Sequence, residues 1–175
     1  GHRLIVSRNR VDHDLRQRAS LGAFDNQHID FCFFLAYENG GAKFINMPEH
    51  DSAITTYNAL IENNVIDYLG NRGIPFLYAS SQLAGSRTPY GQAKLRGERL
   101  VNESGHGKSF RLWNAYGVEP VGTKSHVIAD WIWQCLQTNR TALSRTNGLE
   151  RRQFAHTSDI ARILEQLMQS HRTLP

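Results

Sequence analysis

A serine, a tyrosine and a lysine stand close together in the stretch SSQLAGSRTPYGQAKLRGERL, which begins at Ser80. Tyr90 and Lys94 are four residues apart, so on a helix that starts near Pro89 both side chains project from the same face. An ammonium beside a phenol favours the phenolate and lowers the phenol pKa from about 10 toward working pH. The pattern indicates proton exchange by Tyr90, with Ser81 holding the same substrate oxygen. A Tyr and Lys pair at this spacing also arises by chance on amphipathic helices.

The elements that must position these residues alternate between strand and helix. Continuous apolar runs at 31–36, 76–80 and 110–113 are typical of buried parallel strands. Apolar stripes at helical spacing fill the segments between and after them, from 54 to 68, from 90 to 101, from 127 to 136 and from 160 to 168. This alternation predicts an α/β fold, a Rossmann-like doubly wound parallel sheet with helices on both faces.

Three strand ends carry the polar residues of interest. Ala36 and Tyr37 end the first run, Ser80 and Ser81 end the second, and Asn114 ends the third. Ligands of open parallel sheets bind beyond the carboxyl ends of the strands, so we expect these residues to face one crevice.

Composition narrows the class of protein. The chain has 175 residues, 40% of them hydrophobic, and a formal net charge of +4, which predicts a single globular domain over residues 1–175. No dense Lys/Arg tract, membrane-length apolar segment or metal-ligand spacing occurs, so we expect no nucleic acid, membrane or metal partner. Cys32 and Cys135 lie in apolar runs, which favours buried thiols in a reducing, cytoplasmic setting.

Several motifs in order along the chain resemble those of the extended short-chain dehydrogenase/reductases, in particular the nucleotide-sugar epimerase/dehydratase family. The segment FLAY, ending at Tyr37, is similar to the family's HLAA, and Tyr90 with Lys94 is similar to its YxxxK. The segment RLWNAYG, around Asn114, is similar to RxxNxYGP, and RQFAH, beginning at Arg152, is similar to RDFxHV.

This resemblance implies the site. Ser81, Tyr90 and Lys94 would be catalytic. NAD, with NADP as the alternative, would be held by Tyr90, Lys94 and the set Asp14, Leu15, Leu35, Ala36 and Tyr37. A nucleoside-diphosphate sugar would be held by Asn114 and Arg152, so residues 115–175 would contribute substrate-binding elements. The family also implies a homodimer, formed through the helices at 58–69 and after Tyr90 as a four-helix bundle.

His126 lies in SHVI, a segment similar to one in GDP-fucose synthases. It is either a substrate-side acid or contact, or a histidine at a helix start without a chemical role.

The sequence departs from the family at its front, where no GxxGxxG precedes Asp14. That glycine turn normally lets backbone N–H groups meet the cofactor pyrophosphate, so we expect an incomplete first βαβ unit, and an incomplete C-terminal substrate cap. Arg8 and Arg10 are candidates for an NADP 2′-phosphate site or for a solvated strand edge.

Gln82 and Leu83 narrow the reaction, because they stand where the family's dehydratases carry an Asp-Glu pair and its 3,5-epimerases a cysteine. We therefore expect a 4-epimerase or ketosugar reductase that works at one sugar carbon. The alternatives are a noncatalytic or truncated member that binds a nucleotide or partner, and a dehydratase.

Overall fold

The computed structural model describes residues 3–7, 13–141 and 147–173, and the chain forms two compact units. The first unit comprises residues 1–38 and 52–110, and the second comprises residues 39–51 and 111–175. The chain therefore leaves the first unit after Glu38, returns at Ser52 and leaves it again after Phe110. A substrate-binding role for residues 115–175 stays a prediction.

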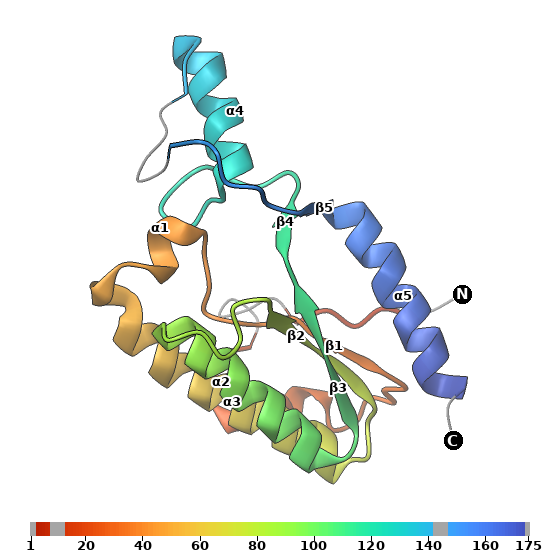
Figure 1. The fold of residues 1–175 in the computed structure, drawn as a ribbon. Helices are drawn as coiled ribbons and strands as arrows, with labels where there is room; N and C mark the ends of the chain where they lie inside the picture. The colour runs from red at the N-terminus through yellow and green to blue at the C-terminus, as the bar shows by residue number, and fades with distance from the viewer. Residues whose placement is uncertain (1–2, 8–12, 142–146, 174–175) are drawn as a thin grey trace. The chain divides into compact units, whose positions relative to one another are not determined.

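The first unit is built on a three-stranded sheet in the order β1(Cys32–Phe34), β2(Phe76–Ser81) and β3(Gly107–Leu112). β1 runs parallel to β2, with Cys32 opposite Phe76 and Phe34 opposite Tyr78. Two long helices, α2(Asp51–Asn71) and α3(Pro89–Ser104), run side by side along this sheet (Figure 1). This parallel sheet flanked by helices confirms the predicted Rossmann-like α/β class.

Apolar side chains from these elements form the core of the first unit. The 3₁₀ helix η1(Arg18–Phe24), α2, α3 and the sheet all contribute to it. Its buried members are Leu15, Leu21, Phe34, Ile61, Val65, Ile66, Leu69, Ile74, Phe76, Tyr78 and Val101. The α2 members recur three and four residues apart, which is the spacing of one helix face. The predicted apolar stripe therefore packs where the pattern places it.

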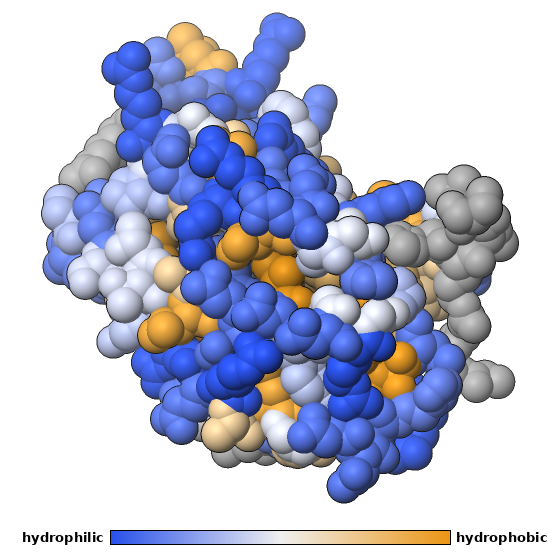
Figure 2. Space-filling view, turned by 90° about the horizontal axis from the view of Figure 1, so that it is seen from below, coloured by the Kyte–Doolittle hydropathy of each residue, from blue (hydrophilic) through white to orange (hydrophobic). Residues whose placement is uncertain are grey.

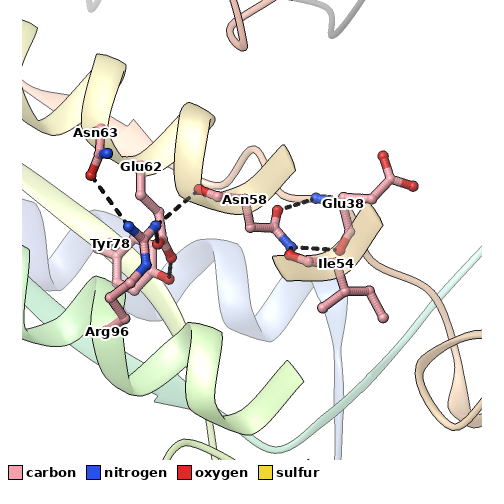
Figure 3. A network of polar contacts seen from close by, with 7 residues as sticks. All are labelled: Glu38, Ile54, Asn58, Glu62, Asn63, Tyr78 and Arg96. Carbon is pink, nitrogen blue, oxygen red and sulfur yellow. Dashed lines mark hydrogen bonds and ion pairs between the residues drawn. The ribbon is translucent and has the colours of Figure 1, made fainter. Parts of the chain in front are cut away.

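A buried asparagine ties the start of α2 to the end of the preceding segment. Asn58 is fully buried, and its side chain accepts a hydrogen bond from the Glu38 amide (2.6 Å) and donates one to the Glu38 carbonyl (3.1 Å) (Figure 3). It also donates to the Ile54 carbonyl at 2.7 Å. Asn58 thus fixes the backbone where the chain leaves the first unit to the helix on which it returns.

The second unit contains a two-stranded parallel sheet, in which β4(Asn114–Tyr116) pairs with β5(Phe154–His156). Its helical elements are α1(Ala42–Ile45), η2(Pro48–His50), α4(Val127–Thr138) and α5(Thr157–Thr173). α5 packs against both strands of this small sheet. No helix of the described residues combines the length and apolar character that a membrane crossing requires.

Two details of the sequence prediction are wrong. Asn114 begins the separate strand β4 instead of ending the third run, which reaches only Leu112. Cys135 is exposed, because α4 turns much of its apolar side outward, including Ile132 and Leu136. Cys32 is mostly buried, and burial raises the pKa of its thiol to about 12.

Candidate active site

Ser81, Tyr90 and Lys94 all belong to the first unit, and a compact loop connects the first two. Ser81 is the last residue of β2, and its carbonyl accepts a hydrogen bond from the Ala84 amide at 2.9 Å. Thr88 caps α3 by accepting a hydrogen bond from the Gly91 amide at 3.1 Å, and Pro89 opens the helix. Tyr90 is therefore fixed on the first turn of α3.

Ser81 and Tyr90 are the two residues for which the sequence predicts proton exchange. Both are buried, with 9% and 6% of their surface exposed. Burial raises the pKa of Tyr90, and the nearby Ser81 side chain opposes that rise. The expected lowering of this pKa by Lys94 is absent, because the Lys94 ammonium lies 5.9 Å from the Tyr90 ring centroid and is directed to another partner.

That partner is the backbone of β2. Lys94 Nζ donates a hydrogen bond to the Ala79 carbonyl oxygen at 2.6 Å, and the residue is only 3% exposed. The ammonium also lies 3.3 Å from the ring centroid of Tyr37 and 4.8 Å from that of Tyr78. Burial lowers the pKa of Lys94 to about 7, so its charge is sensitive to pH near neutrality.

The segment after β1 supplies the aromatic cover of Lys94. The Tyr37 ring meets the Tyr90 ring edge to face, with 6.0 Å between centroids. Its hydroxyl is buried without a hydrogen-bond partner among the described residues, and burial raises its pKa. Leu35 is exposed and Ala36 is partly buried. A cofactor role for these three residues stays a prediction.

The residues expected to meet the adenine are held by other groups. The Asp14 carboxylate accepts hydrogen bonds from the Arg16 guanidinium at 2.8 and 2.7 Å. Leu15 is buried in the core, and its carbonyl accepts from Asn64 at 3.0 Å. Arg8 and Arg10 lie outside the described residues.

The expected substrate residues lie in the second unit, where two of them are close in the fold. Asn114 donates a hydrogen bond from its side chain to the Gln153 carbonyl at 2.9 Å, directly beside Arg152, which is exposed. His126 precedes α4, and its Nδ1 lies 2.8 Å from the Glu119 carboxylate, which also accepts from the His126 amide. The structure therefore pairs Asn114 with the Arg152 segment and gives His126 a carboxylate partner.

Sequence reasoning missed Glu62, a fully buried carboxylate on α2. Its hydrogen-bond donors are Tyr78 and Arg96, and Tyr78 also lies beside Lys94. The available signal was its place on the buried face of α2, one helical turn after Asn58.

A comparison with protein families decides the assignment. The sequence model of the NAD dependent epimerase/dehydratase family matches residues 2–175. The chain belongs to this family. No curated protein matches the chain significantly.

Solved structures of other proteins have the same fold. Pen from Bacillus thuringiensis matches with a TM-score of 0.73 and 20% identity, over 89% of this chain and 48% of that chain. A GDP-D-glycero-L-gluco-heptose synthase from Campylobacter jejuni, solved with NADPH, matches with a TM-score of 0.71 and 17% identity, over 94% and 66%. The ADP-L-glycero-D-manno-heptose-6-epimerase of Helicobacter pylori matches with a TM-score of 0.67 and 16% identity, over 84% and 52%. The present chain thus spans about half the length of the first relatives it matches.

The site offers hydrogen-bond donors that suit the reactive end of the family's cofactor. Apart from the bond to Ala79, no hydrogen bond is found from the Lys94 ammonium to the described residues, which leaves N–H groups for ligand hydroxyls such as those of a ribose.

Proposed function

We propose that the chain is part of an NAD(P)-dependent nucleotide-sugar epimerase or ketosugar reductase that oxidises and reduces one sugar carbon. The observation that carries this proposal is the placement of two buried residues, Ser81 at the end of β2 and Tyr90 on the first turn of α3, with Lys94 one turn further along α3. Family membership supports the reaction class.

In this proposal Tyr90 takes the proton of the sugar hydroxyl during oxidation and returns it during reduction. Ser81 hydrogen-bonds the same oxygen and holds it in place. The cofactor, held by Tyr90, Lys94 and the segments at 14–15 and 35–37, supplies hydride transfer at that carbon. Gln82 and Leu83 offer no carboxylate or thiol, so we propose a reaction that needs no acid or base beyond Tyr90.

The proposed substrate is a nucleoside-diphosphate sugar. Asn114 and Arg152 would bind its diphosphate, since a guanidinium fork matches phosphate oxygens. His126, with Glu119 as its partner, would be a contact on the sugar side. We also propose a homodimer through α2 and α3, as the family resemblance implies. Figure 2 shows one face of the molecule, on which apolar patches lie among mostly hydrophilic residues.

A binding panel followed by one conservative variant tests the function. UDP-, GDP-, dTDP- and CDP-sugars with NAD or NADP are screened by thermal shift, since a ligand of the native state raises the melting temperature. With the pair that binds, Tyr90→Phe should lower turnover by about 100-fold or more, because the phenol that exchanges the proton is gone. Tyr68→Phe is the matched control, since Tyr68 hydrogen-bonds Arg72 instead. Unchanged turnover in Tyr90→Phe would exclude the mechanism.

One observation favours a second function, a noncatalytic nucleotide- or partner-binding member of the family. Tyr37 covers the Lys94 ammonium, and Arg16 holds the Asp14 carboxylate, so two expected cofactor contacts are already engaged. Binding of a nucleotide sugar without any binding of NAD or NADP in the same panel would select this function.

A further inference from the structure

A buried carboxylate lies behind the proposed site and has no role in the mechanism above. Glu62 is 0% exposed, and its Oε1 accepts a hydrogen bond from the Tyr78 hydroxyl at 2.6 Å. Its other oxygen pairs with the guanidinium of Arg96 from α3 (Figure 3). Burying a carboxylate costs several kcal/mol unless charge and hydrogen bonds compensate it, so the neighbours of Glu62 decide its protonation.

The helix opposite makes room for this carboxylate. Gly97 of α3 faces it, and a Cβ at that position would collide with Glu62 Oε1 and with the Tyr78 hydroxyl. A glycine inside a helix costs about 1 kcal/mol relative to alanine. The close approach of α2 and α3 at this point therefore depends on the missing side chain.

Tyr78 connects the carboxylate to the proposed site. Its hydroxyl bonds Glu62, and its ring centroid lies 4.8 Å from Lys94 Nζ. The Lys94 ammonium itself has a neutral carbonyl, Ala79, as its hydrogen-bond acceptor, and the face of Tyr37. Neither supplies a full negative charge, so a buried ammonium here requires an anion nearby.

Charged and titratable groups reach Lys94 from each packed element. Glu62 on α2 and Glu98 on α3 both raise the pKa of Lys94, Glu62 more strongly, while burial lowers it. Glu98 accepts a hydrogen bond from Ser80 at 2.5 Å. The three tyrosines around the ammonium, Tyr37, Tyr78 and Tyr90, have pKa values raised by burial and are neutral near pH 7.

The charge on Glu62, like that on Lys94, depends on opposing effects of burial and of neighbouring groups. Burial raises its pKa, and the hydrogen bond from Tyr78 and the charges of Arg96 and Lys94 oppose that rise. Lys94 and Glu62 thus stabilise each other's charged forms. Both belong to the first unit, and both contact Tyr78.

We propose that Glu62 is a positioning residue whose carboxylate keeps the buried Lys94 ammonium charged between Tyr37 and Tyr78. This inference deepens the proposed function, because Lys94 then presents a cation near Tyr90 and to cofactor hydroxyls. Arg96 supports this role, since its charge and hydrogen bond lower the pKa of Glu62 and so favour the carboxylate.

The test measures the charge of Lys94 directly. The protein is labelled with ¹³C at lysine Cε, the Lys94 resonance is identified by its loss in Lys94→Met, and its pKa is read by NMR titration. Glu62→Gln should lower the pKa of Lys94 by at least one unit, a tenfold change in the protonation constant. Glu103→Gln, on the same helix as Lys94, is the matched control and should leave it unchanged.

A second variant separates charge from folding. Arg96→Met keeps Glu62 but removes the cation that favours its charged form, so Glu62 should protonate more readily and the pKa of Lys94 should fall, as in Glu62→Gln. Damage to packing would expose Lys94 and raise its pKa in both variants. A pKa that is unshifted or raised in Glu62→Gln overturns the proposal.

This readout needs no turnover, so it separates the two proposals. If Glu62→Gln lowers the pKa of Lys94 while Tyr90→Phe leaves turnover intact, the role of Glu62 stands and the proposed mechanism fails. If Tyr90→Phe loses turnover while Glu62→Gln leaves the pKa of Lys94 unchanged, the mechanism stands and the role of Glu62 is rejected.

Discussion

At the scale of single residues, the ring of Tyr37 stands over the Lys94 ammonium, with 3.3 Å between Nζ and the ring centroid. A cation against an aromatic face is stabilised by about 0.5–2 kcal/mol, and more where water is excluded. A ligand that uses the same ammonium must first displace the ring. The cost of that displacement appears as weaker apparent binding.

Removing the ring should therefore strengthen cofactor binding. Tyr37→Ala keeps the backbone of the 35–37 segment but removes the ring, and we expect it to bind NAD or NADP roughly tenfold more tightly, because the covered state no longer competes. Tyr37→Phe keeps the ring and should bind like the wild type. Isothermal titration calorimetry of the three proteins measures the effect, and equal affinities for Tyr37→Ala and wild type would show that the ring does not obstruct the cofactor.

The residues of the proposed site differ in how far the sequence could predict them. Ser81, Tyr90 and Lys94 lie close in the chain, so a local pattern places them on one strand end and one helix. The direction of the Tyr90 pKa depends on tertiary burial, which no local pattern contains. Glu62 was missed for the same reason, since its partners Tyr78 and Arg96 come from distant segments.

At the scale of elements, the contact between α2 and α3 depends on which glycines face a neighbour. Gly97→Ala should destabilise the protein by about 1–3 kcal/mol, because the added methyl group overpacks the Glu62 and Tyr78 pair. This loss exceeds the gain in helix propensity.

Gly70 of α2 provides the matched control for that prediction. A Cβ there would meet only the Ser104 Cβ at 3.7 Å, an ordinary contact. Gly70→Ala should therefore be neutral or stabilise the protein by up to about 1 kcal/mol. Urea unfolding of both variants gives the two free energies of unfolding. Equal values would show that Glu62 and Tyr78 can move aside for a methyl group at position 97 without loss of stability.

Element boundaries were predicted best where a residue sets them locally. Pro89 opens α3 as expected, and Gly105, with φ of 69°, ends it in the left-handed region that favours glycine. β3 begins at Gly107, before the apolar run that predicted it, because Lys108 and Ser109 join the strand through backbone pairing. The separate strand β4 was not predictable, since its partner β5 lies about forty residues away.

At the scale of the whole molecule, the pKa of Lys94 makes stability depend on pH. The folded value of about 7 lies below the usual value of 10.5. Between these values the unfolded chain binds more protons, so stability rises with pH by about 1.4 kcal/mol per pH unit. Cys32 opposes this above about pH 9, because its folded pKa of about 12 exceeds its usual value.

Comparison with Lys94→Met isolates this dependence. The difference in free energy of unfolding, wild type minus variant, should increase by about 2 kcal/mol between about pH 7.5 and 9. Other titrating groups largely cancel in the difference. Urea unfolding across this range measures it, and parallel curves for the two proteins would mean that Lys94 keeps its usual pKa when folded.

The fold class was predictable, because continuous apolar strands alternating with helical stripes leave few arrangements. The division into two units was not, since one of them combines residues 39–51 with 111–175, and no composition change marks either boundary.

The hydrogen bonds of Asn58 to Glu38 have a consequence for how this fold can vary between relatives. They join the two ends of the segment 39–51, which belongs to the second unit. The first unit therefore fixes the positions at which this segment starts and ends, but places no constraint on its length. Doubling the length of a flexible loop costs only about 0.6 kcal/mol in closure entropy. Insertions between Glu38 and Asn58 should therefore cost little stability. Relatives can change the second unit in this way while the sheet of the first unit and its two helices stay unchanged.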